Sequence, residues 1–158
     1  MHLESFYRVT FTTPESWSVT REGADGSEGQ SFLIAEGRAE GGIAARYRAA
    51  NFPRRRVDRA LEPAFRGVLE TDDDASILFH WDGLAGLTHS GMRQLVGMLL
   101  HVSDDERYRW LNDRVCAVEG EVRPRSDGAG FDVVLDVSLM TSTFGEPAPG
   151  SGAGTVEA

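Results

Sequence analysis

Short stretches in which apolar and polar residues alternate recur along this chain, and such alternation is typical of a β-strand with one buried face. The clearest is 131–141, where Phe131, Val133 and Leu135 alternate with polar residues such as Asp132. Similar patterns predict strands over further stretches, which are 3–13, 17–20, 31–39, 43–50, the two arms of 66–81, 92–102 and 115–122. Helical periodicity is almost absent, so the pattern predicts an all-β protein.

Turn-forming residues between these stretches indicate that neighbouring strands pair as antiparallel hairpins. Asp73-Asp74 separates the two arms of 66–81 and tolerates the left-handed backbone that a tight turn needs. Gly41-Gly42 separates the next most evident pair of strands, and glycine adopts positive φ without steric cost. Two hairpins are therefore expected at these positions.

Other stretches are expected to interrupt the strands. Pro14 should end the first strand, and the polar, glycine-rich stretch 22–29 is typical of a surface connector, with a cover over a barrel mouth as the less favoured interpretation. The glycines of 82–86 also predict a loop. Ser103 and Glu106 form a capping box that predicts a short helical turn, in which the Ser103 hydroxyl accepts from the Glu106 amide.

The number and spacing of the strands favour a closed sheet over an open one. About eight strands at hairpin spacing predict a single closed antiparallel β-barrel with one short helical turn, because closure removes exposed edges. An eight-stranded barrel is just wide enough to hold one small ligand. We expect the barrel domain to span 1–143 and the Gly-, Pro- and Ala-rich remainder, 144–158, to be a flexible tail.

Composition narrows the classes of partner. The 158 residues suit one domain, and 41% are hydrophobic. A net charge of −9 and a pI near 4.9 argue against nucleic acid and against an anionic membrane surface, since both require a basic face. A single cysteine, a first segment without signal-peptide character and the lack of a long apolar run predict a cytoplasmic location.

The local signatures of metal and cofactor sites are missing from the sequence. His80, His89 and His101 fall on different predicted elements, without the paired spacing of a barrel metal site, so no metal is expected. No phosphate-binding loop, dinucleotide fingerprint or nucleophile elbow is present, and we expect no cofactor. Cys116 is better explained as a buried thiol than as a nucleophile.

Three stretches resemble one known protein family. They are RGVLETDD at 66–73, ILF at 77–79 and SDDERYRWLN at 103–112, and together they resemble the domain-of-unknown-function 3237 family over most of the chain. The resemblance implies one antiparallel barrel, similar to allene oxide cyclase barrels, that encloses a cavity. The sequence departs from the family pattern at Asp74, where a glycine is usual, and near 51–53, where an Asp-Trp pair is missing.

Six charged or titratable residues occupy alternate positions on three neighbouring strands. They are Arg66 with Glu70, His80 with Asp82, and Arg93 with His101. If these faces point inward, they form an acid/base set in which His80, Glu70 and His101 move protons and Arg66, Asp82 and Arg93 hold the substrate. If the faces point outward, Phe79 and Trp81 fill the interior instead, and alternation alone weights the two arrangements evenly.

Two further features carry weaker signals. Trp110 and Asn112 lie just before a strand and could contact a ligand, although packing for the indole and capping for the amide are favoured. Four arginines within 54–59 could bind an anion, but a solvated loop is the favoured interpretation.

Three functions follow from these features. The first is a barrel enzyme that uses acid/base chemistry, of the cyclase, isomerase or lyase type, on a small hydrophobic oxygenated molecule. The alternatives are a non-catalytic carrier or sensor of such a molecule, and a protein-interaction module with a solidly packed barrel. A homodimer is also expected, because a short barrel exposes apolar side chains outside.

Overall fold

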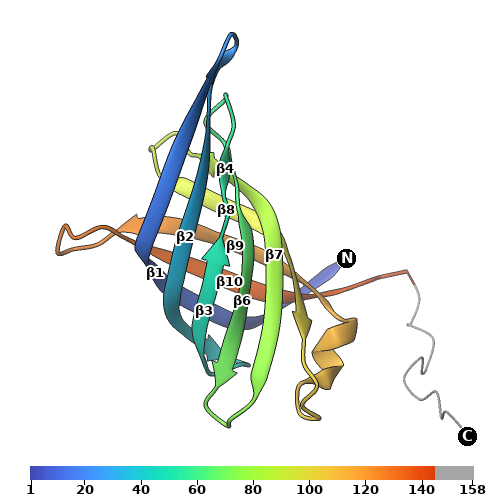
Figure 1. Ribbon diagram of the computed structural model, residues 1–158. Coiled ribbons are helices and arrows are strands. Elements are labelled where there is room, and N and C mark those ends of the chain that lie inside the picture. The colour runs from blue at the N-terminus through green and yellow to red at the C-terminus, as the bar shows by residue number, and fades with distance from the viewer. Residues whose placement is uncertain (145–158) are drawn as a thin grey trace, which may run out of the picture.

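A computed structural model describes residues 1–144, and these fold into one closed ring of eight antiparallel strands (Figure 1). The described residues form ten strands, and all except the short β4 and β5 belong to the ring. They are β1 (His2–Gly23), β2 (Gly26–Gly41), β3 (Ala45–Asn51), β4 (Arg54–Arg55), β5 (Leu61–Glu62), β6 (Ala64–Thr71), β7 (Ser76–Leu87), β8 (Arg93–Val102), β9 (Val115–Pro124) and β10 (Phe131–Thr141). A single 3₁₀ turn, η1 (Arg109–Asp113), precedes β9. The predicted all-β closed barrel with one short helical turn is confirmed, and the predicted tail lies almost entirely outside the described residues.

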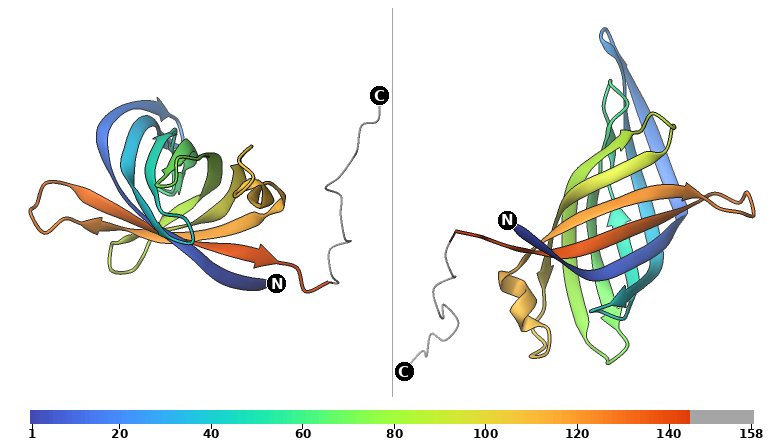
Figure 2. Two further views of the ribbon diagram at one scale, coloured as in Figure 1. Left: turned by 90° about the horizontal axis from the view of Figure 1, so that it is seen from below. Right: turned by 180° about the vertical axis from the view of Figure 1, so that it is seen from behind.

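The ring runs β1-β10-β9-β8-β7-β6-β3-β2 and closes where β2 pairs with β1 (Figure 2). The short strands β4 and β5 form a side branch between β2 and β7. Both predicted hairpin turns are present: Asp74 has φ 66° and Gly41 has φ 116°. Closure leaves each of the eight ring strands with a partner on both sides, so their inward side chains share one interior.

The first strand is longer than the sequence suggests. Pro14 does not end it but lies within β1, at the register shift between Thr12 and Glu15, where the ladder does not need the amide that proline lacks. The stretch 22–29 is paired β-structure up to Gly23↔Gly26, so the loop prediction for it was wrong.

The glycines of 82–86 also lie within a strand. Gly83 faces Gly97 across the β7–β8 ladder, and a Cβ on Gly83 would lie 2.2 Å from the Val96 carbonyl oxygen. Gly83 therefore allows a close approach of two backbones, which is a common reason for glycine in a strand, whereas a Cβ on Gly86 would meet no atom within 4 Å.

The helical turn forms, but with different capping. The Ser103 hydroxyl accepts from the Asp105 amide at 3.2 Å, not from Glu106. Asn112 holds the start of the connection instead, since its Oδ1 accepts from the Ser103 amide at 2.8 Å and its Nδ2 donates to the Ser103 carbonyl at 2.9 Å. The amide of Asn112 thus joins the two ends of the β8–β9 connection.

Aromatic rings fill much of the barrel interior. Phe11 and Phe79 stack on either side of Tyr47, each with ring centroids 5.1 Å apart, and Phe65 stacks on Trp81 at 4.6 Å. All five side chains are buried. Burial of large rings is the main apolar contribution to folding that a barrel of this size can make.

Phe79→Ala should therefore lower the free energy of unfolding by about 3 to 5 kcal/mol, because it leaves a cavity among stacked rings. Phe131→Ala is the matched control, since Phe131 is exposed on β10, and it should cost below about 1 kcal/mol. Urea unfolding of both variants checks this. Equal losses at the two positions would contradict the assignment of the interior.

Candidate functional site

The structure divides the six predicted site residues between the two faces of the barrel wall. On β6, Phe65 and Leu69 point inward, so Arg66 and Glu70 point outward. On β7, Ile77, Phe79 and Trp81 are buried in the core, and the alternate residues His80 and Asp82 belong to the outer face. On β8 alone the predicted polar face is the inner one, and Arg93 and His101 lie on it.

The four outward residues therefore do not share a cavity with the two inward ones. Arg66 forms a bidentate ion pair with Asp82, with both N···O distances 3.1 Å, and Arg46 lies 3.9 Å from Glu70. His80 is half-buried on the outer face, opposite Arg66 in the ladder. The expectation of one inward-facing set is corrected here, because the apolar partners on β6 and β7 take the interior.

His101 is the inward residue with the most defined surroundings. It is 1% exposed, its Nε2 lies 2.9 Å from the Tyr7 hydroxyl, and its Nδ1 lies 3.9 Å from the Cys116 sulfur. Burial lowers the pKa of His101 to about 4, raises the pKa of Cys116 to about 11 and raises that of Tyr7. At neutral pH all three groups are uncharged, and a Tyr7 hydroxyl that donates to Nε2 leaves the ring proton on Nδ1, facing the sulfur.

Arg93 lies at the other end of the inner face of β8. Its guanidinium is partly buried, and its Nη1 donates to the Ala85 carbonyl at 3.3 Å. Among residues 1–144, none of the ion pairs includes Arg93. Burial lowers its pKa, as expected for a cation withdrawn from water without a carboxylate to neutralise it.

Two buried polar atoms in the interior have no hydrogen-bond partner among the described residues: the Tyr47 hydroxyl and the Trp81 indole nitrogen. Burial raises the pKa of Tyr47, and the nearby Trp81 N–H opposes that rise only in part. Each unpaired buried group costs about 1 to 3 kcal/mol relative to a satisfied one. Tyr47 was not among the predicted site residues, since alternation places it on one face of its strand but shows neither that this face is inward nor whether its hydroxyl is paired.

The remaining predicted positions have structural contacts. The oxygen and the nitrogen of the Asn112 side-chain amide both form hydrogen bonds with the Ser103 backbone, which is the capping role. Trp110 lies within η1, is 44% exposed and packs edge-on against Phe6, with ring centroids 5.6 Å apart. Neither side chain belongs to the hydrophobic core of the barrel.

Two of the four arginines in the stretch 54–59 form ion pairs on the surface. Arg54 lies 2.7 Å from Glu28 and 3.5 Å from Glu62, and Arg56 lies 2.8 Å from Asp58. The favoured interpretation as a solvated segment agrees with this arrangement.

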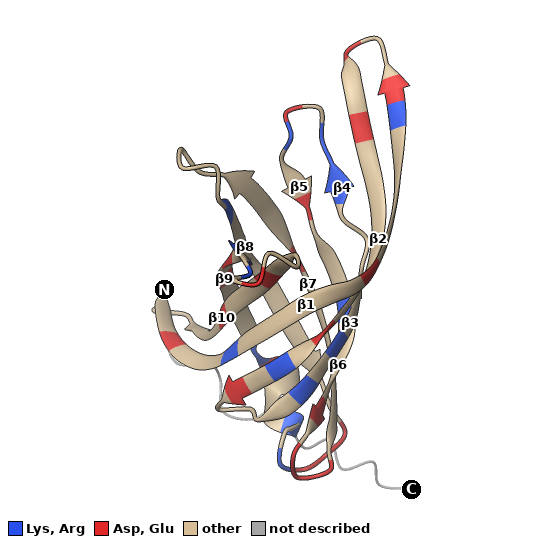
Figure 3. Cartoon of the chain, turned by 90° about the vertical axis from the view of Figure 1, so that its left-hand side faces the viewer, with Lys and Arg blue, Asp and Glu red and all other residues tan. Residues whose placement is uncertain are grey.

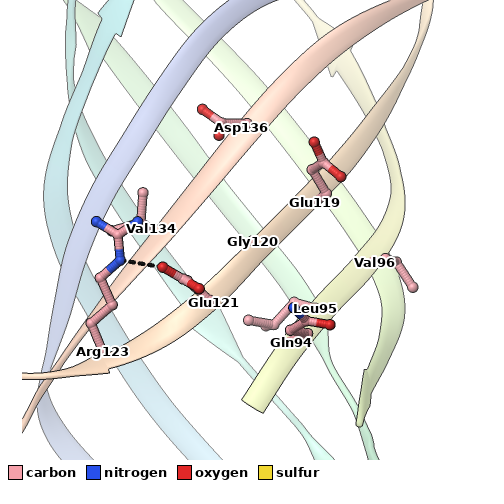
Figure 4. Close-up of a pocket in the computed structure, with 9 residues that line it drawn as sticks. All are labelled: Gln94, Leu95, Val96, Glu119, Gly120, Glu121, Arg123, Val134 and Asp136. Atoms are coloured by element: carbon pink, nitrogen blue, oxygen red, sulfur yellow. Dashed lines mark hydrogen bonds and ion pairs between the residues drawn. The ribbon is translucent and has the colours of Figure 1, made fainter. Parts of the chain in front are cut away.

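An outer hollow of about 320 Å³ lies over β8, β9 and β10 (Figure 4). Glu119, Glu121 and Asp136 line it, but arginines neutralise two of these acids: Arg123 pairs with Glu121, and Arg8 pairs with Asp136 at 2.7 Å. Within residues 1–144 no group of three or more His, Cys, Asp and Glu side chains is placed to hold a metal ion. No helix in the same part of the chain has the length and apolar character to cross a membrane.

The buried histidine predicts a pH dependence of stability. The unfolded chain protonates His101 near the ordinary pKa of 6.5 and the folded protein only near pH 4, so stability is unaffected above about pH 7 and falls from about pH 6.5 towards 4. The loss should reach about 3 kcal/mol. His101→Gln keeps an acceptor for Tyr7 without titrating, and its urea-unfolding free energy should fall less over that window. Parallel pH profiles would contradict the prediction.

Comparison with known proteins identifies the fold. The sequence matches no family model and no curated protein. A β-barrel-like protein from Acinetobacter baumannii is similar in structure, with TM-score 0.73 and 17% identity over 87% of this chain and 94% of that chain. A protein of unknown function from Clostridium acetobutylicum has TM-score 0.72 and 14% identity over 89% and 100% of the two chains.

A third similar structure is an enzyme from Penicillium herquei, with TM-score 0.59 and 16% identity over 86% of this chain and 93% of that chain. At such identities the likeness extends to the fold alone. The chain is therefore a β-barrel of the shape shared by these proteins.

Proposed function

We propose that this protein binds a small, largely hydrophobic organic molecule inside the barrel, through an oxygen acceptor such as a carbonyl or carboxylate. The observation that carries the proposal is the pair of neighbouring buried donors, Tyr47 and Trp81, neither of which has a hydrogen-bond partner of good geometry within residues 1–144, whereas the buried His101 and Tyr7 side chains are hydrogen-bonded to each other. Native proteins rarely leave such groups unpaired, and a bound acceptor would satisfy them.

Arg93 supplies the second anchor in this proposal. On the inner faces of β7 and β8, the residues between Arg93 and Trp81 include Ala85, Gly83 and Gly97. In this proposal an elongated molecule extends along these two strands from the guanidinium to the indole. A half-buried arginine without a carboxylate partner favours an anionic or strongly polar end on that molecule.

The interior gives limited support to catalysis. Of the three predicted acid/base residues, His101 alone faces inward, where it is neutral and hydrogen-bonded to Tyr7. In an enzyme of the cyclase, isomerase or lyase type, this pair would move a proton while Tyr47 and Trp81 stabilise a developing oxyanion. The enzyme from Penicillium herquei supports the idea that this fold can host catalysis.

A carrier or sensor would need only the groups that bind the ligand, which are Tyr47, Trp81 and Arg93. An interaction module with a solidly packed barrel would need none of them. The unpaired donors favour the two ligand-binding functions over the packed module. Membership of the domain-of-unknown-function 3237 family, a cytoplasmic location and independence from metals and redox cofactors remain parts of the proposal.

Arg93→Ala should weaken binding of a fluorescent hydrophobic anion, such as anilinonaphthalene sulfonate, by about 2 to 5 kcal/mol, because the contact is partly desolvated. Arg66→Ala is the matched control, since Arg66 is exposed and paired with Asp82, and it should change binding by less than about 1 kcal/mol. Fluorescence titration measures both. Equal effects of the two substitutions would place the anion outside the barrel.

Tyr47→Phe and Tyr7→Phe should change stability in opposite directions in the ligand-free protein. Tyr47→Phe removes an unpaired hydroxyl and should stabilise the fold by about 1 kcal/mol, whereas Tyr7→Phe breaks the bond to His101 and should destabilise it by about as much. Tyr47→Phe should also weaken ligand binding. Urea unfolding and the titration above test these expectations, and a destabilised Tyr47→Phe would show that its hydroxyl is already paired.

A further inference from the structure

The outer face of β8 is apolar, although it lies on the outside of the barrel. Val96, Met98, Leu100 and Val102 all point outward, and Met98 is 62% exposed. The inner face of the same strand carries Arg93 and His101. Strand β8 thus turns its more apolar side to the exterior, the reverse of what burial alone would select.

Neighbouring strands add apolar side chains to this surface, although the outward His80 and Asp82 lie between Leu78 and Leu84 on β7. In the ladders, Val102 lies opposite Leu78 and Val96 opposite Leu84 on β7, while Leu100 lies opposite Val115 on β9. We call the seven exposed apolar residues of this region the β8 face, and they are Leu78, Leu84, Val96, Met98, Leu100, Val102 and Val115.

Other parts of the barrel exterior have ordinary polar character. The outward positions of β2 include Glu36, Arg38 and Glu40, and those of β3 include Arg46 and Arg48. Figure 3 shows both charge types along this side of the barrel. The contrast shows that β2 and β3 do not share the apolar exterior of β8.

The size of the β8 face suits an interface. The exposed fractions of its seven residues correspond to on the order of 600 Å² of open surface, at the upper end of the roughly 300 to 600 Å² patches found on monomers. A standard protein interface buries about 800 Å² on each partner, including a polar rim. The face therefore supplies most of the area that a stable dimer needs, and bordering residues such as Glu119 and Arg66 can supply a rim.

We propose that a second copy of this chain covers the β8 face in a two-fold symmetric, face-to-face packing of the two barrel walls. Strand β8 is paired on both sides, so a partner cannot add to its edge and must pack against its side chains. A chain of net charge −9 meets its own copy with least repulsion on an uncharged surface, and the outward residues 96–102 of β8 carry no charge. A symmetric interface needs only one self-complementary patch.

The stretch 145–158 is a poorer occupant by composition. Its one aliphatic residue larger than alanine is Val156, among Gly, Pro, Ala, Ser, Thr and Glu. Such a segment offers little apolar surface to set against seven exposed side chains. The proposal concerns outward side chains only, so it stands or falls independently of ligand binding inside the barrel.

The test compares two glutamate substitutions in the full-length chain. Met98→Glu places a charge in the centre of the β8 face, and two-fold symmetry repeats this charge on the second copy. The substitution should therefore raise the dimer dissociation constant by about 100-fold or more. Val19→Glu is the matched control, because Val19 is 69% exposed on β1, away from that face, and it should leave the constant unchanged. Sedimentation velocity from about 1 to about 100 μM measures association, and circular dichroism verifies folding.

The expected result is a wild-type particle of twice the 17.3 kDa chain mass, and a folded Met98→Glu monomer. The melting temperature of wild type should rise with concentration, while that of Met98→Glu should not. A monomeric wild type would overturn the proposal and leave the face to another occupant. A dimer that survives Met98→Glu, or is lost in Val19→Glu, would place the interface elsewhere and overturn it as well.

Discussion

Closure of the eight strands into a ring is the constraint on which the rest of this structure depends. Once β2 pairs with β1, every second residue of every ring strand is committed to a single interior, and its neighbours are committed to the exterior. A register shift of one residue would exchange the two sets completely. The stacked rings of Phe65 with Trp81 and of Tyr47 with Phe79 show which set the fold has buried.

This division also sorts the charges. On the outer wall, carboxylates and guanidinium groups pair with each other across neighbouring strands, as Arg66 does with Asp82 and Arg8 with Asp136. In the interior, His101 is neutral because burial lowers its pKa, and it shares a hydrogen bond with Tyr7. The interior is therefore largely apolar, with a few uncharged polar groups and with Arg93 at one end. Such a region suits recognition of a hydrophobic molecule with one polar end better than chemistry that needs several ionised side chains.

Strand β8 links the two proposals made for this protein. Its inner face presents Arg93 and His101 to the interior, and its outer face presents Val96 and Met98 to the exterior. A strand that is apolar outside and carries polar groups inside departs from the usual pattern on both faces. Sequences usually depart from local rules where function requires it, and the two faces of β8 are the places where a ligand and a second chain would compensate for the departure.

The sequence by itself determined the class of fold. Alternation in stretches such as 131–141, the turns at Asp73-Asp74 and Gly41-Gly42, and the scarcity of helical periodicity were enough to predict an antiparallel barrel of about eight strands. These signals are local, because turn chemistry and a period of two are properties of neighbouring residues. Local signals misled where one residue type serves two purposes: Pro14 lies at a register shift instead of a strand end, and Gly83 allows two backbones to approach instead of forming a loop.

Only the tertiary structure decided which face of each strand is inside. Alternation defines two faces on each strand but does not show which of them is buried. The more apolar face is buried on β6 and β7 but exposed on β8. The pairing of His101 with Tyr7, 94 residues apart, and the absence of a partner for the Tyr47 hydroxyl in the described part of the chain depend on strands that the sequence separates. The physical reason is that burial belongs to a position in the closed ring, whereas hydrophobicity belongs to a residue, and the two agree only on average.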